Sequence, residues 1–294
     1  MITKEGWPIH QSPQPVIGTA TLMVHNIERM LAFYKDILGF RVHERSQGAV
    51  SLSADGKNVL LKLEEDTEAK LRETRTTGLY HIAFLLPGRT DLADVLKHLA
   101  QRRYPLQGAS DHDVSEALYL ADPEGNGLEI YVDRDATSWK WEKGQVFMTT
   151  KPLDIDDLLM DASQAGWNGM PSDTLIGHIH LQVSNLEDSK AFYCDGIGLD
   201  PVLRFGSQAL FISWHNYHHH IGLNTWNSAG EGQPKEKSTG LKHFSIVFSD
   251  EDERRKAIAR LKILNAWITE ENGTIITKDP SGIHMILEVS RKGE

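Results

Sequence analysis

The sequence predicts an α+β protein made of four similar modules, each running from a strand through a helix into several further strands. Two observations support this prediction: an internal repeat at a nearly constant spacing, and hydrophobic patterns that switch between strand and helix periods within each repeat. A length of 294 residues is sufficient for two halves that each bury a core. Helices packed on one face of a mixed sheet are typical of the α+β class.

Three motifs each occur twice along the chain, which is how a duplicated unit is recognised in a sequence. They are Asn…Ala-Phe-Tyr-x-Asp…Gly at 26–39 and 185–198, Thr-Gly-Leu-x-His at 77–81 and 239–243, and Asp-Pro-x-Gly at 122–125 and 279–282. The three offsets are nearly equal, so the chain contains two homologous halves.

Each half divides again into two modules that begin with an apolar strand. The four first strands are expected at 17–24, 81–86, 179–183 and 243–248, and the helices that follow them at 26–38, 91–103, 185–197 and 251–265. Asn26 and Asn185 stand at N-cap positions, and Gly39 and Gly198 stand where two of the helices should stop. Further strands, including 59–63 and 219–223, complete the modules, and a short helix is expected at 154–164.

The composition is ordinary for a globular protein, with 40% hydrophobic and 24% charged residues. The net charge of −10 argues against nucleic acid and anionic membrane as partners, because both select basic surfaces. No apolar run approaches the ~20 residues of a membrane helix, and residues 1–15 lack the apolar centre of a signal peptide. The single cysteine, Cys194, excludes an internal disulfide, and these features together favour a cytoplasmic protein.

The most specific motif lies at 110–129, where His112, Tyr119, an Asp-Pro-x-Gly turn and Glu129 follow one another. This combination resembles the signature of extradiol dioxygenases. The fourfold module pattern resembles the vicinal-oxygen-chelate superfamily, which also includes glyoxalase I and the fosfomycin and bleomycin resistance proteins. Within that superfamily the chain most resembles the catechol 2,3-dioxygenases. Ser110 departs from the signature at a position without a chemical role.

The resemblance covers roughly residues 15–132 and 175–290. It implies that the four modules form two cupped half-barrels of mixed sheet, with a divalent metal on the floor of a cup. The expected organisation is a first two-module domain at 1–132, a connector at 133–176 and a second two-module domain at 177–294.

By resemblance, Glu129 is a metal-binding carboxylate, Tyr119 a pocket hydroxyl that faces a substrate oxygen, and His112 a hydrogen-bond donor outside the set of metal ligands. His81 and His178 begin module strands at the position of the family's metal histidines. Two histidines and one carboxylate form a facial triad that leaves positions of Fe(II) free for a diol and dioxygen. The plainer interpretation is that Glu129 is an exposed strand residue and that Tyr119 and His178 belong to the core.

Three adjacent histidines, at 218–220, precede Gly222. The resemblance implies an acid–base histidine here, a role suited to a group whose pKa lies near the operating pH. The register of the motif favours His219, whereas alternation along a strand favours His220, since 218, 220 and 222 would share a face. Glyoxalase-like relatives carry a metal glutamate at the position of Gly222, so its absence implies three protein ligands.

The complete set of site residues requires the second and third modules to share one cup. The connector at 133–176 is long enough for this crossed pairing. The alternative, in the third and fourth modules, is His178, His243 and Glu288, but Ile276 then stands where the pocket tyrosine should be.

The resemblance therefore implies an Fe(II)-dependent extradiol dioxygenase that opens the ring of a small aromatic diol with dioxygen. Mn, Ni or Zn are the other divalent metals that the same ligands suit. One rival interpretation is a glyoxalase-like isomerase or transferase with Ni or Zn, and another is a binding or resistance protein without turnover, because a fold alone does not fix chemistry. Self-association is common in the family, so a homo-oligomer is a further partner class to test.

Overall fold

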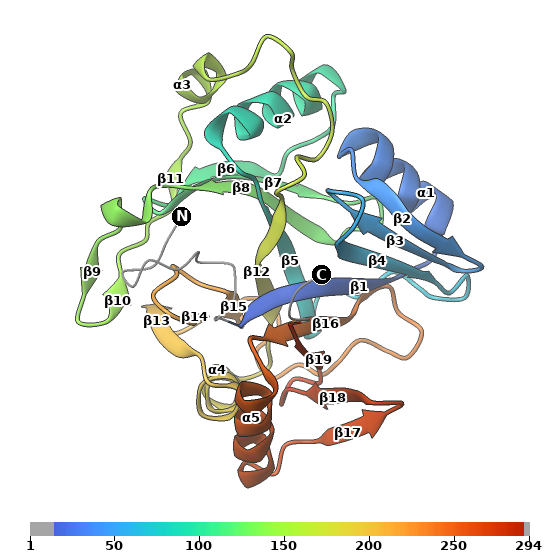
Figure 1. The fold of residues 1–294 in the computed structure, drawn as a ribbon, viewed down its shortest axis with the longest axis vertical. Helices are drawn as coiled ribbons and strands as arrows, with labels where there is room; N and C mark the ends of the chain where they lie inside the picture. Colours follow the sequence, from blue (N-terminus) through green and yellow to red (C-terminus); the bar gives the residue numbers. More distant parts are fainter. Residues whose placement is uncertain (1–14, 291–294) are drawn as a thin grey trace.

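The computed structural model describes residues 15–290, which form two strongly curved sheets with helices around them (Figure 1). Most of the N-terminal segment in which no signal peptide is expected lies outside this range, as do residues 291–294. Within 15–290 no helix has both the length and the apolar character needed to span a membrane. The predicted α+β class and its curled half-barrel sheets are confirmed.

The first sheet has eight strands in the order β17-β18-β19-β16-β1-β4-β3-β2. Their bounds are β1 Val16–Val24, β2 Arg41–Ser46, β3 Ala49–Ser53, β4 Val59–Glu65, β16 Gly240–Phe248, β17 Ile268–Glu271, β18 Thr274–Lys278 and β19 His284–Val289. It therefore consists of the first and fourth modules.

The second sheet has nine strands in the order β11-β6-β7-β8-β5-β12-β15-β14-β13. Their bounds are β5 Gly78–Leu85, β6 Gly108–Asp111, β7 Ser115–Ala121, β8 Gly127–Asp133, β11 Lys151–Pro152, β12 Leu175–Gln182, β13 Asp200–Phe205, β14 Ala209–Ser213 and β15 Ile221–Asn224. It consists of the second and third modules together with a short strand of the connector.

The modules are thus paired across the two sequence halves. β1 runs antiparallel to β16 in the first sheet, and β5 runs antiparallel to β12 in the second. Figure 1 shows β1 beside β16 and β5 beside β12, although each pair is far apart in the chain. The boundaries expected at 132 and 177 divide the repeat in the sequence, whereas each sheet takes one module from either side of the connector.

The helices follow the predicted pattern, and their bounds are α1 Ile27–Ala32, α2 Arg89–Gln101, α3 Ile155–Met160, α4 Leu186–Lys190 and α5 Glu251–Ile263. α1 and α4 each continue into a π-helical turn, at Phe33–Ile37 and Ala191–Ile197. The side chains of Asn26 and Asn185 accept backbone N–H bonds at the two helix starts, as expected of N-caps.

The repeated motifs contact each other within each half. The Tyr34 hydroxyl donates to Asp122 Oδ2 at 2.9 Å, and the Tyr193 hydroxyl donates to Asp279 Oδ2 at 3.0 Å. All four side chains are buried. Each Ala-Phe-Tyr helix is therefore tied to the Asp-Pro-x-Gly turn of the next module, and this tie links the first sheet to the second.

One predicted strand begins later than the sequence suggests. β15 starts at Ile221, and residues 214–220 form an irregular turn after β14. His215 and Asn216 have φ values of +50° and +60°, so the chain reverses there rather than extending. Strand alternation therefore does not apply to His218, His219 and His220.

Candidate metal centre

The three side chains expected to bind a metal lie together in the middle of the second sheet. His81 is on β5, Glu129 on β8 and His178 on β12, and β5 lies between the other two strands. The Nε2 atoms of His81 and His178 are 3.0 and 3.1 Å from Glu129 Oε2. One ligand atom from each residue lies within 4.8 Å of the others, and all three residues are buried.

The register of the strands explains this convergence. Ala83 is the pairing partner of Glu129 in the parallel β5–β8 pair and of His178 in the antiparallel β5–β12 pair. His81 precedes Ala83 by two residues, so both point to the same face of the sheet. A small side chain at Ala83 leaves space between the carboxylate and the two imidazoles.

The protonation states of the centre suit a divalent cation. Burial opposes the charge of Glu129, but the two histidines outweigh it and hold the pKa of the carboxyl well below its usual value. Burial lowers the pKa of His178 to about 4, although Glu129 acts in the opposite direction. Neutral imidazole and ionised carboxylate are the forms that bind metal ions.

Two buried nitrogen atoms of the centre, His81 Nε2 and His178 Nδ1, lack a hydrogen bond within the described residues. His81 Nε2 makes none, although it lies close to Glu129. A buried polar atom without a partner is costly, and a cation at the centre of the triad would satisfy His81 Nε2. The donor set and this atom therefore fit a divalent metal.

A cavity of about 470 Å³ opens beside the triad. Its lining includes the apolar side chains of Met148, Leu203, Phe205, Phe211 and Trp226. No lysine or arginine lines it in the described part of the chain. An apolar space next to a few convergent polar groups is the usual form of a small-molecule site.

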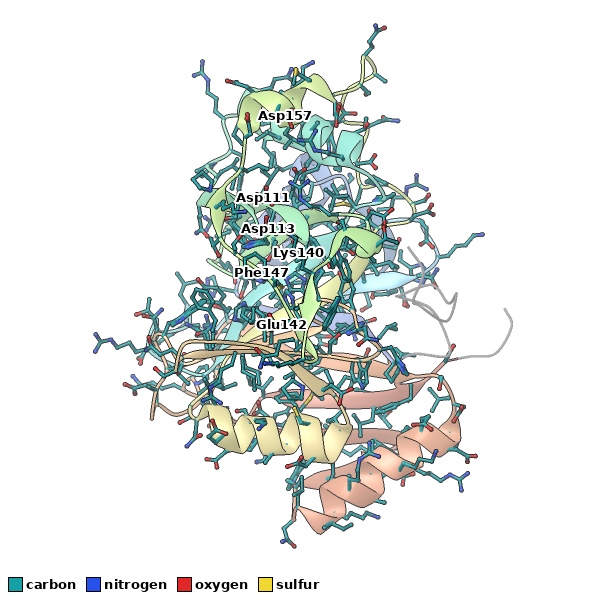
Figure 2. The ribbon with its side chains drawn as sticks, turned by 90° about the vertical axis from the view of Figure 1, so that its left-hand side faces the viewer. Asp111, Asp113, Lys140, Glu142, Phe147 and Asp157 are labelled. Carbon is teal, nitrogen blue, oxygen red and sulfur yellow. The ribbon has the colours of Figure 1, made fainter. Side chains whose placement is uncertain are left out.

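The connector supplies one wall of this cavity through Met148, Thr149 and Thr150. These residues follow the two-stranded ribbon of β9 Trp141–Glu142 and β10 Gln145–Val146. Lys140, Glu142 and Phe147 mark the ribbon in Figure 2, where it lies below Asp111 and Asp113. Thr149 Oγ1 donates to Asp113, and Lys151 Nζ lies 2.6 Å from the same carboxylate.

Tyr119 and His112 also line the cavity and are hydrogen-bonded to each other. His112 Nδ1 lies 2.6 Å from the carbonyl oxygen of Thr149, so this nitrogen donates. His112 Nε2 lies 2.7 Å from the Tyr119 hydroxyl, so the two side chains are linked at the cavity wall. Burial, with Glu129 adding to it, raises the pKa of Tyr119 well above its usual value, so the phenol keeps its proton.

The two candidates for the acid–base histidine differ in position. His219 lines the cavity, with its ring centroid 4.1 Å from that of His178, and burial lowers its pKa well below the usual value. His220 is not among the cavity-lining residues; its Nδ1 lies 2.9 Å from Ser213 Oγ and its ring packs on Trp214. The geometry favours His219.

The alternative ligand set is not brought together. His243 lies on β16 and Glu288 on β19, both in the first sheet, whereas His178 lies on β12 of the second. Of the aromatic residues in the turn before β15, Trp214 and Tyr217 are buried outside the cavity.

His180 is a cavity residue that sequence reasoning missed. Its Nε2 accepts from Asn224 Nδ2 at 3.1 Å, and its ring covers Gly222, where an added Cβ would lie 2.8 Å from the imidazole. The position of the glyoxalase-like glutamate is thus blocked by His180. The spacing of His178 and His180, two residues apart on one strand face, is a signal that points to it.

Comparison with known proteins agrees with these features. A model of the glyoxalase/bleomycin resistance protein/dioxygenase superfamily matches residues 16–130 and 175–285. Catechol-2,3-dioxygenase of Bacillus subtilis (strain 168) is 43% identical over 269 residues, which cover 90% of this chain and 93% of that protein. Biphenyl-2,3-diol 1,2-dioxygenase 3 of Rhodococcus globerulus is 29% identical over 125 residues, or 42% of this chain and 66% of that protein.

Two solved structures show the same fold. A putative dioxygenase from Bacillus subtilis superposes with a TM-score of 0.67 at 14% identity, covering 95% of this chain and 86% of that one. Glyoxalase I from Zea mays superposes with a TM-score of 0.57 at 12% identity, covering 93% and 92%.

Proposed function

Since the chain belongs to the glyoxalase/bleomycin resistance protein/dioxygenase superfamily, we propose that it is an extradiol dioxygenase that opens the ring of an aromatic diol with dioxygen. The single observation that supports this most is the buried triad of His81, Glu129 and His178 at the floor of an apolar cavity. Both oxygen atoms of dioxygen enter the ring-opened product, so the reaction needs no external reductant.

The proposed cofactor is Fe(II), held by these three residues, with Mn, Ni and Zn as the other metals that the ligands suit. When bound, Fe(II) supplies positions at which diol and dioxygen meet and carries electrons between them. His180 over Gly222 keeps a fourth protein ligand out, so one side of the centre faces the cavity.

The remaining residues act on the substrate. His219 accepts a hydroxyl proton of the diol and returns it as the ring opens, a role for a buried imidazole that is neutral before the reaction. The Tyr119 hydroxyl, which keeps its proton, orients a substrate oxygen. Phe211, Leu203 and Met148 exclude water around the ring.

The test is anaerobic loading with Fe(II), followed by a catechol and then air. Oxygen uptake with a yellow product is expected. Absence of oxygen uptake across a panel of catechols, by a protein that holds iron, contradicts the proposal. Conversion of a hemithioacetal with Ni or Zn without oxygen would support the isomerase instead.

A matched pair of variants tests the ligand assignment. Glu129→Gln removes a ligand charge and should lower the iron bound per chain about tenfold or more, measured by elemental analysis. Glu288→Gln makes the same change on β19 of the first sheet and should retain iron. Loss of iron in Glu288→Gln with retention in Glu129→Gln would move the site.

A further inference from the structure

We propose that Asp133 and His218 fix the tautomer of His219, so that its Nε2 faces the cavity without a proton. The inference rests on the proposed function in one respect, since there His219 transfers protons. Asp133 and His218 are positioning residues, because they act through His219.

The three side chains form a continuous hydrogen-bonded line. His218 Nε2 lies 2.8 Å from Asp133 Oδ1, and His218 Nδ1 lies 2.8 Å from His219 Nδ1. The His218 side chain is completely buried. Asp133 Oδ1 also accepts from the Tyr217 hydroxyl at 3.2 Å, which lies 2.7 Å from that of Tyr131.

The direction of each bond follows from the carboxylate. Asp133 can only accept when ionised, so His218 Nε2 donates to it. A neutral His218 then has a lone pair at Nδ1, and the proton between the two rings belongs to His219 Nδ1. The tautomer of a histidine is set by the bond that its other nitrogen makes, so His219 Nε2 is left with a lone pair.

The alternative is a doubly protonated His218, which would donate to His219 and place the proton on His219 Nε2. A neutral ring satisfies both contacts of His218, because it donates at Nε2 to Asp133 and accepts at Nδ1 from His219. A cation held by His178 would also repel a second positive charge on His218, since the two ring centroids are 6.1 Å apart.

The consequence for the reaction is a base that is ready before substrate arrives. The O–H bond of a diol hydroxyl breaks, an N–H bond forms at His219 Nε2, and the ring becomes an imidazolium. Its Nδ1–H still donates to His218, and the negative charge of Asp133 stabilises the positive charge through the neutral ring between them. In Ser-His-Asp triads a carboxylate orients and stabilises the catalytic histidine through a direct bond, whereas here His218 lies between them.

The sequence carries no signal for this line. Asp133 ends β8 in the second module, and His218 lies in the turn before β15 in the third. They meet only because the two modules share one sheet.

The decisive experiment reads the tautomers directly. Long-range ¹H–¹⁵N correlation spectra of the full-length, ¹⁵N-labelled chain are recorded metal-free and loaded with diamagnetic Zn(II). A protonated Nδ1 and a bare Nε2 are expected for His219, and the reverse for His218. A protonated Nε2 on His219 overturns the proposal, whatever the enzyme's activity.

Two variants then connect tautomer to rate. Asp133→Asn removes the charge, and His218→Phe keeps a ring among the surrounding aromatic side chains but removes both nitrogens. In each, the His219 proton should shift towards Nε2 and kcat should fall about 10–100-fold, with KM and iron content within about twofold. His243→Gln, which removes a histidine from the first sheet, is the control with unchanged kcat.

The outcomes separate the two claims. An unchanged kcat in a variant whose tautomer has shifted overturns the inference. Absence of ring cleavage in the wild-type protein contradicts the proposed function, while the tautomer assignment is still decided by the spectra. Asp133→Asn keeps the shape of the side chain, so it serves if His218→Phe does not fold.

Discussion

Two glycines beside the metal centre lack a side chain where neighbouring side chains need the space. A Cβ at Gly177 would lie 1.8 Å from the Tyr131 hydroxyl, and a Cβ at Gly222 would lie 2.8 Å from the His180 ring. Tyr131 in turn packs on His178, with ring centroids 4.8 Å apart. The placement of a proposed ligand therefore depends on a glycine next to it in the chain.

Gly177→Ala should destabilise the protein by about 1–3 kcal/mol, because the added methyl group overlaps Tyr131. Denaturant unfolding measures the change. Tyr131→Phe removes the nearest atom, so the double variant should cost less than the sum of the two single changes. Gly232→Ala, which points into open space, is the control. A Gly177→Ala protein as stable as wild type would contradict the geometry.

The absence of lysine and arginine from the described cavity lining predicts substrate preference. A carboxylate on the diol ring would be buried without a partner, which costs several kcal/mol. The kcat/KM for 4-methylcatechol should therefore exceed that for 3,4-dihydroxybenzoate by about 100-fold or more, measured by oxygen uptake. Equal values for the two diols would refute this view of the cavity.

At the scale of residues, the sequence predicts a site residue when that residue belongs to a recognisable motif or begins a module strand. His81, Glu129 and His178 have such positions, and the structure brings them together. The choice between His219 and His220 could not be made, because a turn with two positive φ values replaces the expected strand. Asp133 and His218 could not be paired before the sheet order was known.

Between elements, the two buried Tyr–Asp ties connect helix ends to the turns of neighbouring modules. Tyr193 joins the π-helical turn after α4 to Asp279, and Asp279 also accepts from the backbone N–H groups of Ser281 and Ile283. Burial raises the pKa of Asp279 from 3.8 to about 6 in spite of these bonds. The contribution of this Tyr193–Asp279 tie to the stability of the folded protein therefore depends on pH.

Between pH 3.8 and about 6 the folded protein holds a proton on Asp279 that the unfolded chain has released. The contribution of this group to stability therefore falls as the pH rises, by about 3 kcal/mol in all. Asp279→Asn cannot ionise, so its stability relative to wild type should rise by about that amount from pH 4 to pH 7. Urea unfolding at both pH values measures it.

The stability of Asp122→Asn relative to wild type should also rise from pH 4 to pH 7, because burial raises the pKa of Asp122 at the equivalent tie to Tyr34. A difference between Asp279→Asn and wild type that is the same at both pH values would argue against the assigned cause.

Hydrophobic period and capping predicted the four main helices and their first strands well, since both signals are local. The role of the connector was not predictable. Trp139 and Val146 pack against Val202 and Tyr217, which belong to the third module. Such a contact depends on partners distant in the sequence, and no local pattern encodes it.

The whole molecule is organised by exchange between its halves. The metal centre takes His81 and Glu129 from the first half and His178 from the second, and both central strand pairs, β1–β16 and β5–β12, join opposite halves. The repeat predicted the four modules, and the distribution of site residues favoured pairing across the two halves. Strand and helix propensities alone do not distinguish this pairing from pairing of modules within each half.

Fragments 1–165 and 166–294 should therefore not bind metal when produced separately, because neither contains the full triad or a complete sheet. Co-expressed, they should copurify and bind one metal ion per pair, measured by elemental analysis. Stoichiometric, Glu129-dependent binding by fragment 1–165 alone would contradict the role of His178.

The first sheet is the counterpart of the sheet that holds the centre, yet Thr19 and Ile286 stand where His178 and Glu129 would be by the repeat. Among the described residues, the complete ligand set therefore lies in the second sheet alone. The first sheet still joins the two halves of the chain, because within residues 15–290 all strand partners of β1 and β16 belong to it. The ligand positions of the first sheet can therefore hold other residues without changing the three proposed ligands, whereas the β1–β16 pairing still has to form for this sheet to join the two halves of the chain.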